Sequence, residues 1–292
     1  MPTIRRKIDL EVNAILRKAR IAEGQGVKEF LKVVDELRER VILIIAEREK
    51  LSAYTITEIK NTIASITETY RIRFEDVLSE NQRKMFVKGI QTIDVAIDTA
   101  NILKAVPYLS EEVLSNAQKY GAELVTGLTD YVKAEINKKL MLGLIGQKSS
   151  TEIINEIAGK LPSPSVFGTV RNRAMIIART ESNRILSLST SERMKQVGEK
   201  VPDLNKTWQH SHLGHPPRLN HLAMDGIKIP YNEKFKLLGN DGILYEIDGP
   251  YDSILPAGES INCRCHIIPS IARFDKYASE IKAERLAAMQ TT

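Results

Sequence analysis

The chain of 292 residues has the composition of a folded protein, with 42% hydrophobic and 27% charged residues, which excludes an intrinsically disordered chain. Aromatic residues make up only 5% and Trp208 is the single tryptophan, so an aromatic stacking surface for nucleic acid is disfavoured. The 42 basic and 37 acidic residues leave a net charge of +5, which permits contact with DNA or an acidic partner without indicating either.

No segment has the hydropathy of a secretory signal or a membrane anchor. The basic residues at 5–7 are not followed by an apolar stretch, and the longest aliphatic run, 41–46, is about a third of a bilayer crossing. Cys263 and Cys265 are the two cysteines, and one residue separates them, so they cannot build a disulfide framework. We therefore expect a soluble protein that folds in a reducing cytosol and has no membrane segment.

The distribution of proline, histidine and cysteine divides the chain. Pro2 and Pro107 are the only prolines before residue 162, whereas all the histidines and cysteines lie after residue 209. This predicts a mainly α N-terminal body of long helices with coiled-coil-like packing, followed from about residue 200 by short strands in a small α+β module. We assign 1–164 to the all-helical body, 165–270 to the module together with the last long helix, and 271–292 to a C-terminal helix or tail.

Apolar residues at helical spacing predict the first helices of the body. One stripe over 8–19 ends at a break, Gly24-x-Gly26, and a second stripe follows it. A capping box, Thr55-x-x-Glu58, predicts a helix start, and the apolar stepping behind it continues to about residue 100. The narrow apolar seam of this stretch indicates a long helix, or a helix pair, with coiled-coil packing.

Three more helices are predicted before residue 200. Ser110 starts one that continues to about residue 140, Ser149-x-x-Glu152 caps a short one that ends near 162–164, and the last covers 166–197. We expect the apolar stripes of all these helices to pack on one another. The alternative is that a stripe forms a surface that binds a partner.

The last long helix carries an excess of basic side chains. Such faces are usually solvated, and the alternative is a ridge that contacts the phosphates of double-stranded DNA, with an affinity that falls steeply as salt rises. The candidate DNA-contact residues are Arg171, Arg173, Arg179, Arg184, Arg193 and Lys195.

Beyond residue 200 the pattern changes to short strands separated by turns. Strands are predicted at 206–210, 227–230 and 261–268, with glycine- and proline-containing turns between them, including one at 239–242. A short helix from about Phe274 is expected to close the chain.

The two cysteines are candidates for a metal site. Side chains alternate along a strand, so Cys263 and Cys265 are expected to face one way and Arg264 the other. Two thiolates on one face, with His221 as the third ligand and His210 as a fourth, would hold a zinc ion. Two alternatives stay open: the cysteines are small buried hydrophobes beside a core histidine, or they form a strained disulfide.

The same region offers residue types that are used in hydrolysis. Glu181, His210, His221, Asp225 and one of the cysteines could gather in a hydrolase or nuclease site. As a metal-dependent enzyme, it would be centred on His221 with Cys263 and Cys265. Nothing in the spacing requires this arrangement, so no catalytic residue is assigned, and the enzyme stays an alternative function.

Several motifs occur in a fixed order over 165–269. They are Ala178-Arg-Thr-Glu181 on a helix, Trp208, Pro217-Arg218-x-x-His221-x-x-Met224-Asp225-Gly226, and Pro256-x-x-Glu259-x-x-Asn262-Cys263-Arg264-Cys265. This series resembles the phage Mu F-like head-morphogenesis family, the minor head proteins of tailed phages. The chain departs from the family pattern in its His210-Ser-His212-Leu-Gly-His215 cluster and in the two-residue spacing of Glu233 and Phe235.

The resemblance implies a structural role in the virion. Proteins of this family are minor capsid components that join the procapsid through the portal and stay inside the head, and some contact the packaged DNA or leave with it. In some bacterial relatives the module is fused to a toxin. The implied partners are the portal protein, the major capsid or scaffold protein, and double-stranded DNA. We expect the protein inside the head near the portal, and in the host cytoplasm during assembly, with the body at 1–164 as the portal or capsid docking region.

On this interpretation the motif residues build the module and do not catalyse a reaction. Trp208 would lie in the core, and Arg264 would pair with Glu259 or Glu181. The full structural set is Glu181, Trp208, Arg218, His221, Asp225, Gly226, Glu259, Asn262, Cys263, Arg264 and Cys265.

Overall fold

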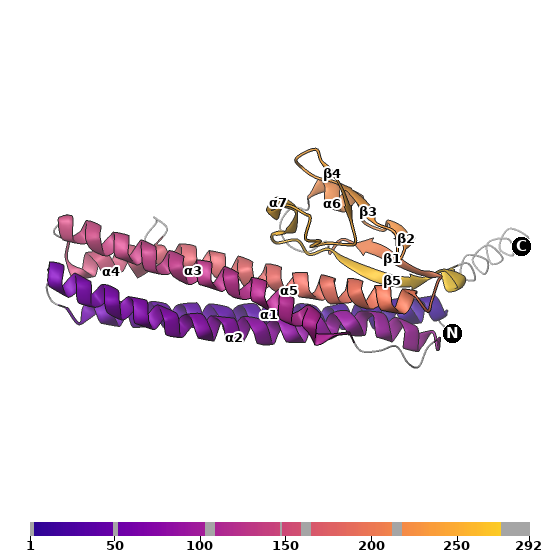
Figure 1. Ribbon diagram of the computed structural model, residues 1–292, viewed down its shortest axis with the longest axis horizontal. Helices are drawn as coiled ribbons and strands as arrows, with labels where there is room; N and C mark the ends of the chain where they lie inside the picture. The colour runs from indigo at the N-terminus through magenta and orange to yellow at the C-terminus, as the bar shows by residue number, and fades with distance from the viewer. Residues whose placement is uncertain are drawn as a thin grey trace, which may run out of the picture. The chain divides into compact units, whose positions relative to one another are not determined.

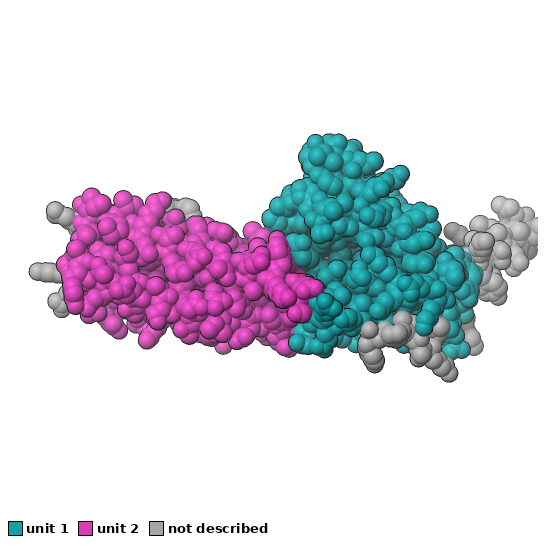
Figure 2. All heavy atoms as spheres, in the orientation of Figure 1, with its two compact units in different colours: residues 1–22, 82–114, 182–292 teal, residues 23–81, 115–181 magenta. Residues whose placement is uncertain are grey.

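The computed structural model describes residues 3–48, 52–102, 109–146, 148–158, 165–211 and 218–275. Among the features predicted from the sequence, the helix end at 162–164, His212 and His215, and the closing helix beyond residue 275 lie outside these residues. The chain divides into two compact units (Figure 2). Unit 1 comprises residues 1–22, 82–114 and 182–292, and unit 2 comprises residues 23–81 and 115–181.

Helices occupy most of the described chain as far as residue 198 (Figure 1). They are α1 (Ile4–Ala46), α2 (Ala53–Thr99), α3 (Glu111–Ile145), α4 (Ser150–Ala158) and α5 (Val166–Gly198). The mainly α body is therefore confirmed. Of the long helix or helix pair predicted up to about residue 100, the structure has the single helix, with 47 residues. Helices α1, α2, α3 and α5 each contribute residues to both units.

The predicted break at Gly24-x-Gly26 is wrong, because α1 continues through it. A glycine inside a long helix costs only about 1 kcal/mol, which a helix of this length tolerates. At Gly26 the glycine also has a packing role, since a Cβ atom there would lie 2.2 Å from Cγ of the buried Asn81 on α2. The absence of a side chain thus lets α1 and α2 approach closely within unit 2.

The capping box predicted for α2 lies one turn too far along the chain. Ser52 is the N-cap: its hydroxyl accepts from the backbone N–H of Thr55 at 3.2 Å, and the Thr55 hydroxyl accepts from the N–H of Ser52 at 2.7 Å. In this capping box Thr55 takes the place of the usual glutamate, so a search for the usual motif does not find it. The second predicted box is confirmed, since Ser149 N–H donates to Glu152 Oε2 at 2.8 Å at the start of α4.

The core of unit 2 is made by the apolar stripes of its own helices. Phe30 of α1 packs against Phe74 of α2 with ring centroids 4.8 Å apart, and the cluster continues through buried residues such as Leu128 of α3, Ile153 of α4 and Val170 of α5. Each buried side chain of this size contributes about 1.5–3 kcal/mol. The expectation that the stripes pack on one another is confirmed for this unit.

The module from residue 204 is built of short strands and two short helices. Its elements are β1 (Leu204–Gln209), α6 (Leu219–Ala223), β2 (Lys228–Pro230), β3 (Phe235–Leu238), β4 (Leu244–Ile247), α7 (Ala257–Ser260) and β5 (His266–Ile271). Strands β2, β1 and β5 form an antiparallel sheet in that order, and β3 pairs with β4 as a separate antiparallel hairpin. The α+β class of the module is confirmed.

Two of the three predicted strands lie close to observed ones, and the third is displaced. The prediction at 261–268 begins too early, because β5 starts only at His266 and the preceding residues form a loop. Strands β3 and β4 were not predicted, although the turn between them at 239–242 was. Within the described residues, no helix is long and apolar enough to cross a bilayer.

The two α1 glycines supply a matched test of the packing in unit 2. Gly24 is exposed and a Cβ atom there would meet nothing within 4 Å, whereas Gly26 faces Asn81. We expect Gly24→Ala to raise the free energy of unfolding by about 0.5–1 kcal/mol through helix propensity. Gly26→Ala should instead lower it by about 1–3 kcal/mol through overpacking. Denaturant unfolding followed by circular dichroism measures both, and equal stabilisation by the two variants would contradict the close approach.

Candidate functional site

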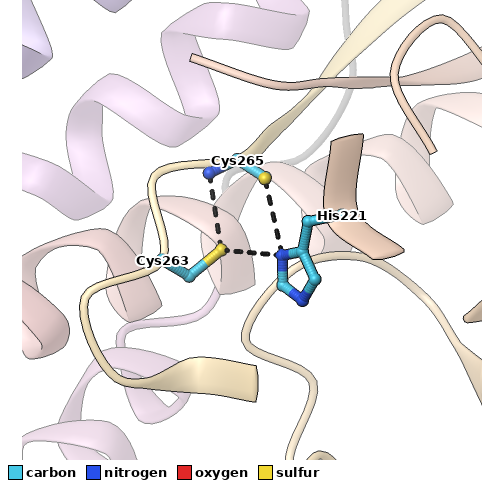
Figure 3. A group of neighbouring side chains, drawn as sticks. All are labelled: His221, Cys263 and Cys265. Atoms are coloured by element: carbon cyan, nitrogen blue, oxygen red, sulfur yellow. Dashed lines mark hydrogen bonds between the residues drawn. The ribbon is translucent and has the colours of Figure 1, made fainter. Parts of the chain in front are cut away.

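His221, Cys263 and Cys265 meet inside the module (Figure 3). The Sγ atoms of Cys263 and Cys265 lie 3.5 Å and 3.6 Å from Nδ1 of His221, and the three atoms all lie within 4.8 Å of one another. The side chains are 2%, 2% and 3% exposed. The chain therefore gathers two sulfur atoms and one ring nitrogen at a single buried point.

A turn after α7 brings the two cysteines to the same side. The N–H of Cys263 donates to the carbonyl of Ser260 at 3.1 Å, and Asn262 adopts a left-handed backbone with φ of 57°, a conformation that asparagine accepts more readily than most residues. The N–H of Cys265 then points at Cys263 Sγ at 3.5 Å. The expected common orientation of the thiols is present, but it comes from this turn and not from strand alternation.

Glu259 of α7 is a buried carboxylate whose two oxygen atoms are both occupied. Oε2 accepts from His221 Nε2 at 2.9 Å and from Asn220 Nδ2 at 3.1 Å, while Oε1 accepts from the backbone and side-chain N–H groups of Asn240 at 2.8 Å and 2.9 Å. Burial alone raises the pKa of the Glu259 carboxyl, but the hydrogen bonds from Asn240, Asn220 and His221 outweigh it, so the pKa lies below its usual value.

The charge of Glu259 determines which nitrogen of His221 carries the proton. An ionised carboxylate only accepts hydrogen bonds, so Nε2 of a neutral His221 ring must be the protonated nitrogen. Nδ1 is then left with its lone pair directed at the two cysteines (Figure 3). This carboxylate–histidine arrangement is the one that orients histidine ligands in metal sites.

The two thiols affect each other's protonation. The Cys265 thiol donates a hydrogen bond to Cys263, which, with a smaller contribution from His221, lowers the pKa of Cys263 well below its usual value although burial opposes this. The same contact and burial raise the pKa of Cys265. Cys263 is therefore the thiol of the pair that loses its proton more easily. Cys265 keeps its proton unless a cation or another partner compensates the negative charge of a second thiolate.

Trp208 of β1 closes one side of this site, as expected for a core residue. It is fully buried, and its ring meets His221 edge-on at 5.6 Å and Phe235 edge-on at 5.5 Å. The carbonyl of Trp208 accepts from the N–H of Gly226 at 2.9 Å. Gly226 lies in the turn at 224–226 and has a positive φ of 79°, which glycine adopts readily. The Asp225 carboxylate accepts from the N–H of residue 210 at 2.8 Å and so anchors the turn to the end of β1.

The remaining predicted site residues lie outside the group of three. His210 is not among the side chains that converge here. Arg218 donates to the carbonyl of Ile261 at 2.6 Å, at the start of the cysteine loop. Arg264 is half-buried, and the hydrogen bonds of its expected partner Glu259 come from other residues. Glu181 is buried on α5 in unit 2.

Asn220 and Asn240 are site residues that the sequence did not reveal. Both hold the Glu259 carboxylate. The only signal for Asn240 was its place in the predicted turn at 239–242, and asparagine in such a turn is usually explained by local backbone geometry. Asn220 carried no signal.

Carboxylates within the same unit engage most of the candidate DNA-contact residues. In unit 2, Arg171 pairs with Asp35 and Arg179 pairs with Glu23 at 3.3 Å. In unit 1, Arg193 pairs with Asp94 and Lys195 contacts Glu192 and Asp248. The guanidinium of Arg173 lies 4.4 Å from the ring centroid of Tyr131, and Arg184 is half-buried on α5. These pairings favour a structural role for the basic side chains over a ridge that binds phosphate.

Comparison with known proteins finds one family model that matches part of the chain. Residues 132–268 match the model of a family described as Phage Mu protein F like protein. This confirms the resemblance expected from the motifs, and the matched span begins within α3, earlier than the expected residue 165. The match supports a phage head protein in general.

A distant curated relative has an enzymatic name. The chain is 23% identical over 268 residues to NAD(+)--arginine ADP-ribosyltransferase EFV of Enterococcus faecalis (strain ATCC 700802 / V583). The alignment covers 87% of this chain but only 52% of the relative, so the chain spans about half of that protein's length. No solved structure matches the chain.

The hydrogen bonds of Glu259 predict a measurable contribution to stability. Glu259→Gln keeps the shape of the side chain but puts N–H groups against at least one of its donors, so we expect the free energy of unfolding to fall by about 2–4 kcal/mol. Glu246→Gln on β4 is the matched control, because Glu246 is exposed and pairs only with Lys236 at 3.8 Å. That variant should stay within about 0.5 kcal/mol of the parent. Equal unfolding curves for the two variants would contradict the role of Glu259.

Proposed function

We propose that this chain is a minor head protein that acts in phage head morphogenesis and binds the portal protein inside the procapsid. The observation that carries the proposal is the match of residues 132–268 to the phage Mu protein F-like family. The mainly helical body and the small α+β module agree with the fold expected from that resemblance. The implied location is the virion, inside the head near the portal.

A group of exposed apolar residues on the β3–β4 hairpin is the best candidate docking surface. Leu238 and Leu244 are cross-strand partners that are both 57% exposed, and Ile243 in the adjoining turn is 55% exposed. Leu219 of α6 is 80% exposed, and its neighbour Asn220 donates to the carbonyl of Leu238 at 3.0 Å, which brings this part of α6 near β3. We call these four residues the hairpin patch. Contiguous exposed apolar residues of this kind are typical of protein–protein contacts.

The family match makes another head component the natural partner for the hairpin patch, and we assign it to the portal protein. The sequence instead predicted docking through the body at 1–164. In unit 2, however, the long apolar stripes of the helices are buried in the unit's own core, which leaves them unable to contact a partner. The body also exposes single apolar side chains, such as Tyr54 at 73% and Ile145 at 76%. The pairing of Leu238 with Leu244 places two exposed leucines directly side by side, and for this reason we propose the hairpin patch first.

The hairpin supplies a matched pair of variants that tests this proposal. Leu238→Ser/Leu244→Ser removes two apolar side chains of the hairpin patch. Lys236→Ser/Glu246→Ser alters the neighbouring exposed cross-strand pair of the same hairpin. With a tagged portal protein from the same phage genome, we expect the parent and the second variant to co-purify and the first to lose at least about tenfold in affinity.

Two outcomes would contradict parts of this proposal. If the parent chain does not co-purify with the portal protein, portal binding is wrong. If Leu238→Ser/Leu244→Ser binds like the parent, the docking surface lies elsewhere, and the helical body becomes the surface to test. The melting temperatures of both variants check that each one is folded, because exposed substitutions of this kind should change stability by no more than about 0.5 kcal/mol.

The alternative of a metal-dependent hydrolase or nuclease rests on His221, Cys263 and Cys265. These side chains are almost completely buried, so a substrate cannot reach them without local opening of the module. We expect the purified chain neither to cleave DNA nor to consume NAD⁺, with and without added divalent metal. Turnover that is lost in His221→Asn while the melting temperature is kept would favour the enzyme instead.

A further inference from the structure

We propose that His221, Cys263 and Cys265 bind a structural zinc ion. This inference is independent of the proposed head function, because it depends only on the geometry of the three side chains. The argument uses the distances between the ligand atoms, the number of lone pairs that they offer, and the group that holds the histidine.

The distances between the donor atoms agree with those of a zinc tetrahedron. With Zn–S bonds of about 2.3 Å and a Zn–N bond of about 2.0–2.1 Å, each sulfur-to-nitrogen edge of the tetrahedron is about 3.5 Å long. The observed separations from His221 Nδ1 are 3.5 Å to Cys263 Sγ and 3.6 Å to Cys265 Sγ. Both sulfur-to-nitrogen separations therefore already match the spacing that one bound ion requires.

Hydrogen bonds can link the three atoms in a chain, with the Cys265 thiol donating to Cys263 and the Cys263 thiol donating to His221 Nδ1. With Nε2 protonated, Nδ1 has a single lone pair in the plane of the ring, and both sulfur atoms lie at nearly equal distance from it. A cation placed between the three atoms would accept one lone pair from each of them at these same separations.

The surroundings of the three ligands also suit a metal. Glu259 holds Nε2 of His221, as carboxylates do for metal-bound histidines, and the N–H of Cys265 points at Cys263 Sγ, where it would stabilise a thiolate. Two thiolates with one imidazole form a soft ligand set, which selects zinc over magnesium or calcium. A water molecule or another donor would complete the four ligands that zinc prefers.

Burial gives the ion a structural role. The three ligands are each at most 3% exposed, and they come from α6 and from the loop between α7 and β5, more than 40 residues apart in the sequence. An ion here would connect those segments in a module whose individual strands have only three to six residues. Metal binding would then contribute directly to the stability of the folded module.

The first experiment measures the metal content of the full chain, purified without a histidine tag under reducing conditions. Plasma mass spectrometry should find about one zinc ion per chain, and Cys263→Ser/Cys265→Ser should lose it. His210→Asn is the matched control, because it removes a histidine of the module that lies outside the group. It should keep the zinc, and its loss of the ion would overturn the three-residue assignment.

A second measurement remains informative if the double variant fails to fold. After a chelator removes the metal from the parent chain, added Co²⁺ should produce the intense visible absorption of a tetrahedral thiolate site, and Zn²⁺ should abolish it. Zinc should also raise the melting temperature and protect both cysteines from alkylation. The proposal is overturned if the reduced parent chain binds neither ion. It is also overturned if a folded double variant contains as much zinc as the parent. The third contradicting result is a disulfide between Cys263 and Cys265 in the purified chain, together with no metal binding once that disulfide is reduced.

Discussion

The buried carboxylate of Glu259 is the interaction on which the candidate site depends. An ionised group that is 2% exposed costs several kcal/mol unless donors replace its hydration, and here four N–H groups do so. The donors come from α6 and from the turn of the β3–β4 hairpin, so one anion connects three segments of the module. The same anion accepts the hydrogen bond from Nε2–H of His221 and thereby leaves Nδ1 facing the cysteines.

Most of the helical architecture could be predicted, because each long helix carries its own periodic apolar stripe. The features that were predicted wrongly or missed depend on a partner distant in sequence or belong to very short elements. Gly26 was interpreted as a break because glycine weakens helices, whereas its meaning depends on Asn81 of another helix. The short strands β3 and β4 were missed since four residues are too few for alternation to stand out, although their turn was recognised.

Half of the candidate site could be predicted from residue chemistry. The pairing of His221 with Cys263 and Cys265 followed from the preference of zinc for such ligands and from the one-residue spacing of the cysteines. The roles of Asn220 and Asn240 could not be predicted, because a neutral amide has many uses and only the fold brings these two side chains to Glu259. His210 was included on residue type alone, and its position at the end of β1 leaves it outside the group.

The burial of the motif residues separates the interior of the module from its exterior. Trp208, His221, Glu259 and the two cysteines are buried and lie in that interior, whereas Asp225 and Gly226 of the same motifs are exposed. Leu238 and Leu244, which lie outside the motifs, are exposed as well. The module therefore keeps an interior closed around a carboxylate and a thiol–histidine group, and it presents both motif and non-motif residues at its surface.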